Sequence, residues 1–281
     1  MVIDAHHHLW DLGRREQGWL DAPELAPIRR TFTVADLRGP AAAAGVDRSV
    51  LVQVLPSVPE TREFLAEAAR SDLVAGVVGW VDLTAPDAAD RLAALREAPG
   101  GDRLVGIRHL VQGEADQRWL CRDDVRRSLR AVADAGLCFD LLTLPNQLPA
   151  AIETVRALPG ATFVLDHLSK PPIAARGTQP WAALLRELAA EPNVYCKLSG
   201  MVTEAGTAHW TVDDLRPYAD VVLDAFGPAR VMFGSDWPVC LLAASYEEVA
   251  QIAGQLTAGL SAVERAEVFG ATAARAYRLA V

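Results

Sequence analysis

VIDAHHHL, residues 2–9, is a short apolar run that turns polar before it ends. The apolar start is typical of a buried strand, in which alternate residues point to the same face. We therefore expect Asp4, His6 and His8 on one face of this strand and His7 on the other. Two imidazoles on one face can chelate a metal ion, because neutral imidazole is the commonest metal ligand in proteins.

A purification tag and a purely structural triplet are the alternatives to a metal site. A purification tag is a longer run with small flexible flanks, whereas this triplet has apolar residues on both sides. A purely structural role stays open for His6 and His8. For His7 the structural role is the preferred interpretation.

Seven further runs along the chain resemble the first. All of them are rich in Val, Leu, Ile or Phe, as expected of strands buried on both faces. With VIDAHHHL, they are SVLVQVLP (49–56), VAGVVGWVDL (74–83), LVGIRHLV (104–111), LCFDLLTL (137–144), TFVLDHLS (162–169), VYCKLSGM (194–201) and VMFGSDWPV (231–239). Amphipathic segments with helical spacing lie between the runs, at residues 59–70, 85–98, 123–136, 148–160, 181–192, 212–227 and 245–259.

This alternation of strands and helices predicts an α/β fold, a (β/α)8 TIM barrel with parallel strands and right-handed crossovers. A doubly wound sheet is the alternative, but the glycine-rich phosphate loop that usually follows its first strand is absent. No linker rich in Pro, Gly or Ser marks a second domain, so we expect one domain over residues 1–281. In such barrels the chemistry lies at the C-terminal ends of the strands.

Composition excludes several classes of protein. The formal net charge of −9 argues against a nucleic-acid partner, and no apolar run reaches the ~18 residues of a membrane helix. The four cysteines form no C-x-x-C pair, and no signal peptide precedes the first run. We expect a cytoplasmic protein without nucleic-acid or membrane partners. A homodimer is compatible with the sequence.

The polar residues late in the runs include a candidate metal centre. His6 and His8 end the first run, His167 lies late in the sixth, and Asp236 lies in the eighth. Three imidazoles and a carboxylate suit one divalent ion, preferably zinc. Asp236 and His167 are also the candidate catalytic residues, with Asp236 as the general base. Core packing for His167 and a turn cap for Asp236 are the structural alternatives.

Arg108 lies inside the fourth run, where an unpaired charge would be costly. It is interpreted as a clamp for a substrate carbonyl, carboxylate or hydroxyl, or else as half of an ion pair with Asp82 or Asp140. Asp4 is expected to orient an imidazole rather than bind the ion.

Three more residues are candidates for substrate binding. His109 follows Arg108 in the fourth run, Gln53 lies in the second, and Trp19 lies in the irregular segment 10–35. This segment follows the first strand and is therefore expected at the barrel mouth.

The lysines restrict the metal chemistry. The chain has only Lys170 and Lys197, and neither lies in the third, fourth or fifth run. A two-metal hydrolase with a bridging carboxylated lysine would need one there. We therefore expect at most one metal ion.

Taken together, DAHHH, VLDHLSKPP, CKLSGM and FGSDWPV resemble the amidohydrolase superfamily. They are most similar to its sugar-lactonase branch, which includes L-fuconolactonases and L-rhamnonolactonases. The resemblance extends from residue 2 to about residue 275, and VVGWVDL, GIRHLVQ and PNVYCKLSGM fit the same branch.

This resemblance implies a hydrolase that opens a small sugar lactone to the aldonic acid. It assigns His6 and His8 to the first-strand pair, His167 to the later-strand histidine, Asp236 to the last-strand general base and Arg108 to the substrate. The bridging lysine of the superfamily is missing. Whether the metal is required stays open, since the histidines can also act as hydrogen-bond donors to the carbonyl oxygen.

Two rival functions stay open at this point. One is a metal-dependent decarboxylase of a small carboxylic acid, which would use the same histidines, with Arg108 on the carboxylate. The other is a non-catalytic sugar-acid binding protein, against which the intact Asp236 argues.

A nucleophilic serine is not expected, because Ser199 and Ser235 lack the G-x-S-x-G elbow of a serine hydrolase.

Overall fold

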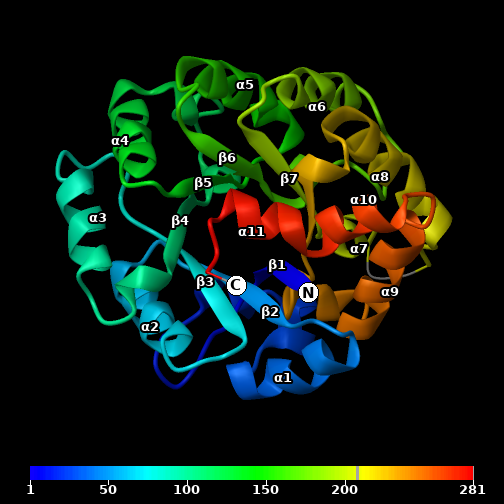
Figure 1. Ribbon diagram of the computed structural model, residues 1–281, viewed down its shortest axis with the longest axis horizontal. Coiled ribbons are helices and arrows are strands. Elements are labelled where there is room, and N and C mark those ends of the chain that lie inside the picture. The colour runs from blue at the N-terminus through cyan, green and yellow to red at the C-terminus, as the bar shows by residue number, and fades with distance from the viewer. Residues whose placement is uncertain (207–208, 281) are drawn as a thin grey trace.

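The computed structural model describes residues 1–206 and 209–280. It contains a parallel sheet of eight strands in the order β1 to β8, and the helices surround this sheet (Figure 1). The predicted (β/α)8 barrel is therefore confirmed. The strands are β1 (Ile3–His7), β2 (Arg48–Val52), β3 (Val74–Gly79), β4 (Leu104–His109), β5 (Cys138–Leu141), β6 (Thr162–Leu165), β7 (Val194–Leu198) and β8 (Val231–Phe233).

The barrel closes between β1 and the segment that follows β8. The backbone N–H of His8 donates to the carbonyl of Trp237 over 2.6 Å, and that of Asp236 donates to the carbonyl of His6 over 2.8 Å. Closure thus places Asp236 beside the histidines of β1, although about 230 residues separate them.

All seven predicted helical segments are helices. One long helix was missed, α1 (Val34–Ala43), because Gly39–Pro40 is a turn-forming pair in sequence. A capping box between Thr33 and Asp36 nevertheless starts this helix. The helices are α1, α2 (Val58–Ala68), α3 (Ala88–Arg96), α4 (Asp123–Asp134), α5 (Leu148–Ala157), α6 (Trp181–Ala189), α7 (Met201–Glu204), α8 (Val212–Phe226), α9 (Tyr246–Leu256), α10 (Ala262–Ala266) and α11 (Thr272–Ala276).

The helix α11 lies across one end of the barrel, near the N-terminus (Figure 1). Ala273, Ala276 and Tyr277 pack there against a small apolar cluster that includes Ile3 and Met232. This end is filled, so a ligand must enter from the opposite end, where the strands finish. Among the described residues, no helix is long and apolar enough to cross a membrane.

A bulge in β1 corrects one expectation. The pairing with β2 shifts register between Asp4 and His7, and an extra residue in a strand reverses the alternation beyond it. Asp4 consequently contacts the outer helix α9, through the Tyr246 hydroxyl at 3.0 Å. It does not share the face of His6 and His8, and it orients no imidazole through a described contact.

The strands end earlier than the apolar runs. Strand β8 stops at Phe233 and β6 at Leu165, so Asp236 and His167 lie in the loops beyond them. The polar ends of the runs therefore form the rim of the barrel. The backbone there is not constrained by the hydrogen bonds of the sheet, so its side chains can point inward.

Candidate active site

Three imidazoles surround one carboxylate oxygen at the barrel rim. The Nε2 atoms of His6, His8 and His167 lie 3.7, 3.5 and 3.8 Å from Asp236 Oδ1. The Nε2 atoms of His6 and His8 are 3.0 Å apart. The structure thus brings together all four residues that the sequence predicted as one cluster.

This donor set fits a single divalent cation. Single ligand atoms of His6, His167 and Asp236 lie within 4.8 Å of one another. The three distances to Asp236 Oδ1 are close to the ~3.3 Å edge of a tetrahedron with bonds of about 2.0–2.1 Å. The Nδ1 atom of His8 lies 2.8 Å from the carbonyl of Val52, which favours a proton on Nδ1 and leaves Nε2 free to bind.

Burial sets the charges of the cluster. It lowers the pKa of His8, lowers that of His6 well below its usual range, and lowers that of His167 to about 4. Burial alone would raise the pKa of Asp236, but the neighbouring His167 and His8 hold that pKa below its usual range. Near neutral pH the imidazoles are therefore neutral and Asp236 is ionised.

A buried network holds the loop that carries Asp236. The carboxylate of Asp4 accepts hydrogen bonds from the Ser235 backbone N–H at 2.8 Å and from its hydroxyl at 2.6 Å. Burial raises the pKa of Asp4 to about 6. Asp4 thus supports the site through Ser235.

His167 opens a left-handed turn. Residues 167–170 have φ angles of 51°, 56°, 57° and 50°, and none is glycine. Such a conformation costs roughly 1–2 kcal/mol per residue, so it persists only where the surroundings enforce it. The Lys170 backbone N–H closes the turn by donating to the His167 carbonyl over 2.7 Å.

Two contacts anchor the middle of this turn. The indole N–H of Trp181 donates to the Leu168 carbonyl over 2.7 Å, and the hydroxyls of Ser169 and Thr143 lie 2.8 Å apart. Leu168 and Ser169 are buried. With its middle fixed in the protein, the turn directs His167 and Lys170 into a cavity at the barrel mouth.

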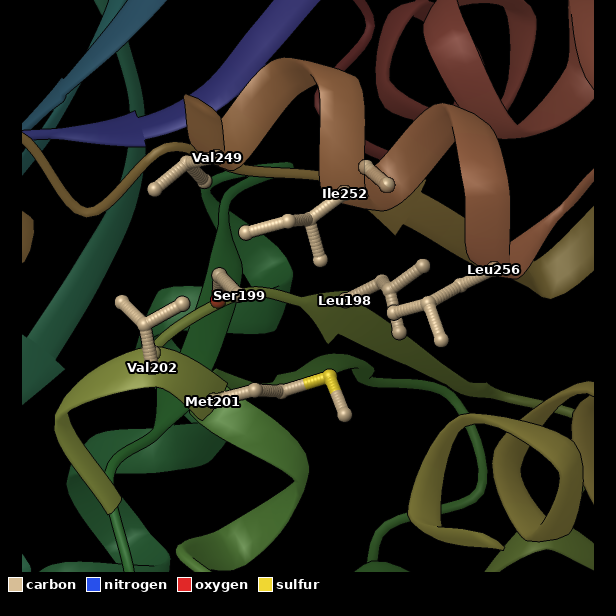
Figure 2. A pocket seen from close by; sticks show the side chains of 9 residues that line it. Leu198, Ser199, Met201, Val202, Val249, Ile252 and Leu256 are labelled. Atoms are coloured by element: carbon tan, nitrogen blue, oxygen red, sulfur yellow. The ribbon is translucent and has the colours of Figure 1, made fainter. Parts of the chain in front are cut away.

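Ser199 and Gly200 support His167 from β7. The Ser199 hydroxyl lies 2.8 Å from His167 Nδ1, and a Cβ on Gly200, whose φ is 68°, would lie 2.7 Å from the same nitrogen. On its other side, Ser199 borders a small apolar cavity between Met201 and Ile252 (Figure 2). This cavity of about 20 Å³ has room for about one water molecule, so it is no substrate site.

Arg108 is both paired and exposed to the cavity. Its guanidinium contacts the side chain and the carbonyl of Gln53 and lies 3.0 Å from Asp166 Oδ2. The expected partners Asp82 and Asp140 were wrong; the partner is Asp166. Because the same side chain lines the cavity, the ion pair and the substrate clamp do not exclude each other.

The sequence reasoning missed Lys197 as part of the site. Its Nζ is buried 2.6 Å from Asp140, 2.8 Å from Asp166 and 3.0 Å from His6 Nδ1. The Tyr277 hydroxyl also donates to Asp140. Beneath the histidines, the positive charges of Lys197 and Arg108 therefore balance the negative charges of the two aspartates. Buried charges need such partners. The visible sign was a lysine inside the apolar run VYCKLSGM.

A cavity of about 300 Å³ opens above the cluster. This volume is at the lower end of the ~300–1,000 Å³ that small-molecule sites occupy. Leucine and valine side chains form much of the wall. The other lining residues are His8, Trp10, Trp19, Arg108, Gln112, His167, Lys170 and Asp236.

Aromatic packing organises the segment that covers this cavity. The rings of Trp10 and Trp19 meet edge to face at 5.3 Å, as do those of Trp10 and Phe32. The indole of Trp10 donates to the Arg30 carbonyl over 2.7 Å. Segment 10–35 is thus folded against the barrel mouth, as expected, and Trp19 lines the cavity.

Gln53 and His109 have other neighbours than expected. Gln53 is buried and contacts Arg108, so it can act on a substrate only through that arginine. His109 stacks on Trp119 at 4.2 Å and contacts Glu114 at 2.7 Å. Neither side chain is among those that line the cavity.

Glu60 supports the wall of the cavity from α2. Its carboxylate accepts hydrogen bonds from the backbone N–H groups of Val54 and Leu55, each over 2.9 Å. Burial raises the pKa of Glu60 to about 7. The sequence reasoning missed this residue, because a glutamate in the first turn of a helix is common.

This chain is similar to known proteins over almost all of its length. A family model described as "Amidohydrolase" matches residues 3–279. The chain is 40% identical over 281 residues to an L-fucono-1,5-lactonase of Burkholderia ambifaria, covering 99% of this chain and 95% of the relative. These matches extend over nearly the whole barrel.

Solved structures are similar as well. The barrel resembles an amidohydrolase of Burkholderia multivorans crystallised with bound HEPES, with a TM-score of 0.92, 39% identity and 99% coverage of both chains. A second crystal structure of an amidohydrolase from this organism, with bound zinc, gives a TM-score of 0.91 at 39% identity and equal coverage.

Proposed function

This chain belongs to the amidohydrolase family, and we propose that it is a hydrolase that opens a sugar lactone such as L-fucono-1,5-lactone to the aldonic acid. The full-length match confirms the resemblance carried by the first-strand and eighth-strand motifs. The lactonase relative aligns with nearly all of this chain, which supports a cyclic ester as substrate.

One observation carries the proposal. An ionised Asp236 lies at the floor of a small cavity, within 3.8 Å of the Nε2 atoms of three neutral histidines. Addition of water to a carbonyl group needs a general base next to groups that stabilise the carbonyl oxygen, directly or through a bound ion. A binding protein without turnover has no use for a base in this place.

The residues support a direct attack of water. Asp236 takes a proton from water as the oxygen bonds to the lactone carbonyl carbon, and the negative charge develops on the carbonyl oxygen beside Arg108. The intermediate then collapses, the bond to the ring oxygen breaks, and Asp236 returns the proton to that oxygen. The acid product ionises, so one proton is released per turnover.

We propose zinc as the cation that His6, His8, His167 and Asp236 would hold. When bound, such an ion polarises a carbonyl oxygen and lowers the pKa of bound water to about 7. The chain supports this role through Ser199 and Val52, which contact the far ring nitrogens of His167 and His8.

The cavity wall suggests how the ring is held. Arg108 is fixed by Gln53 and Asp166 before any substrate binds, and a preorganised donor loses little conformational entropy on binding. We propose that Arg108 and Trp19 contact the lactone. Gln53 then acts by positioning Arg108, and the contribution of His109 to substrate binding stays a prediction.

The test is acid release from a panel of sugar lactones, followed with a pH indicator and compared with spontaneous hydrolysis. The proposal requires saturable release of one proton per lactone opened, with preference for one sugar configuration. Carbon dioxide release from small carboxylic acids would favour the decarboxylase. Tight binding of sugar acids without turnover would favour the binding protein.

Two further predictions concern the protein in the cell. We propose a cytoplasmic location, which cell fractionation would test. A homodimer stays a prediction for size-exclusion chromatography with light scattering.

A further inference from the structure

The geometry points to Lys170 as a specificity-determining residue that binds a ring hydroxyl of the substrate. The inference rests on the proposed lactonase function. It starts from the left-handed turn at residues 167–170, which has four positive φ angles. In a turn with about three residues per repeat, the first and fourth side chains lie on the same side. His167 and Lys170 accordingly both line the cavity.

Most other polar side chains of the cavity already face the reacting centre or are held by neighbouring residues. His8, His167 and Asp236 face the reacting centre, and Arg108 is tied to Gln53 and Asp166. Much of the remaining wall is apolar. Among the lining side chains that the structure describes, Lys170 and Gln112 are left as flexible donors for the hydroxyl groups of a sugar ring, and only Lys170 is charged.

Electrostatics agrees with this position. The positive charge of Lys170 helps to lower the pKa of Asp236 and of His167, although it is not the largest influence on either. The ammonium is therefore close enough to act on the cluster. It is not committed to the cluster, because its ion-pair partner is Glu204 of α7, with the Nζ 3.4 Å from Oε1.

This ion pair provides the structural alternative. Lys170 and Glu204 are each about one-quarter exposed, and the pair joins the left-handed turn to α7. If Lys170 served only to join these segments, removal of Glu204 would have the same effect as removal of Lys170. If Lys170 binds substrate, removal of Glu204 leaves the ammonium in the cavity and preserves binding.

The experiment compares Lys170→Met and Lys170→Gln with Glu204→Gln, the matched control. Each variant is assayed on the preferred sugar lactone and on δ-valerolactone, a six-membered lactone without hydroxyl groups. Where δ-valerolactone turns over too slowly, its inhibition constant against the sugar lactone is measured instead. Unbranched Met and Gln suit the left-handed backbone about as well as Lys, so a common folding defect is not expected.

For Lys170→Met we expect KM for the sugar lactone to rise about 10- to 100-fold, the usual cost of one charged hydrogen bond. The kcat value should change less than about threefold, since the contact forms in ground state and transition state alike. The KM or inhibition constant of Lys170→Met for δ-valerolactone should stay within about twofold of the wild-type value. The KM of Glu204→Gln for the sugar lactone should stay within the same range.

Equal losses on both lactones, or a Glu204→Gln variant that matches Lys170→Met, would overturn the inference and leave a structural ion pair. A wild-type protein that opens no lactone would instead overturn the proposed function. If Lys170→Met does not fold, Lys170→Gln decides by the same comparison, and failure of both to fold assigns Lys170 to the structure.

Discussion

The Nε2 atoms of His6 and His8 lie 3.0 Å apart, whereas both ring nitrogens of His7, the residue between them, are buried without a hydrogen-bond partner among the described residues. The bulge between Asp4 and His7 and the backbone pairing of His7 with Trp237 produce this division. Three identical side chains in a row therefore have two different roles.

Mutations of the three consecutive histidines should differ in their effect on activity. His6→Ala and His8→Ala should each lose at least about 100-fold in kcat/KM, because each removes a ring nitrogen that faces Asp236 and would hold the proposed ion. His7→Leu should remain active and keep or raise its Tm, since it removes two unpaired buried nitrogens. An inactive His7→Leu beside an active His6→Ala would show that the strand register is wrong.

Gly200 should tolerate no side chain. A Cβ at Gly200 would lie 2.7 Å from His167 Nδ1, whereas one at Gly45, which also has a positive φ of 72°, would meet nothing within 4 Å. Gly200→Ala and Gly45→Ala share the backbone cost of a positive φ. We expect both to lose Tm, but only Gly200→Ala to lose activity in addition. Equal kcat/KM values in the two folded variants would contradict this account of His167.

Glu60 should make stability depend on pH. Its folded pKa of about 7 exceeds the usual 4.5, so its proton stabilises the fold fully below about 4.5, and this contribution is lost as pH rises through about 7. Glu60→Gln can still accept from Val54 and Leu55 but does not titrate. Relative to Glu60→Gln, the wild type should lose up to about 3 kcal/mol between pH 4.5 and 8. A difference between the two proteins that does not change with pH would refute the burial argument.

Metal content should follow the four-residue cluster. The wild type should contain about one zinc ion per chain, and His8→Ala should contain less, because each lost ligand weakens a single-ion site. A chelator should lower the Tm of the wild type, since an ion that binds only the folded state stabilises it. An active wild type without metal would show that the ion is not required, and it would assign His6 and His167 the role of hydrogen-bond donors instead.

Much of the fold could be predicted because it follows from local patterns. Eight apolar runs and the helical spacing between them define a parallel barrel, and the position of polar residues at the run ends brings His6, His8, His167 and Asp236 together. Helix α1 was missed because Gly39–Pro40 is a local turn signal. In the fold, helix capping and the burial of Leu37 override that signal.

The missed features depend on contacts between distant segments. The bulge in β1 moves Asp4 toward α9, and strand alternation alone gives no warning of it. Asp166, rather than Asp82 or Asp140, pairs with Arg108 because the β6 backbone ends before it. The left-handed turn that presents Lys170 has no glycine to signal it.

Hydrolysis of a sugar lactone by wild type and by Asp236→Asn is the most direct test of the central claim, that Asp236 is the general base of a lactonase. Asp213→Asn is the control, because its side chain is 91% exposed on α8. We predict that Asp236→Asn keeps its fold by circular dichroism but loses about 10²- to 10⁴-fold in kcat, while Asp213→Asn matches the wild type. An Asp236→Asn variant that retains more than about a tenth of the wild-type kcat, a smaller loss than removal of a general base produces, would contradict the claim.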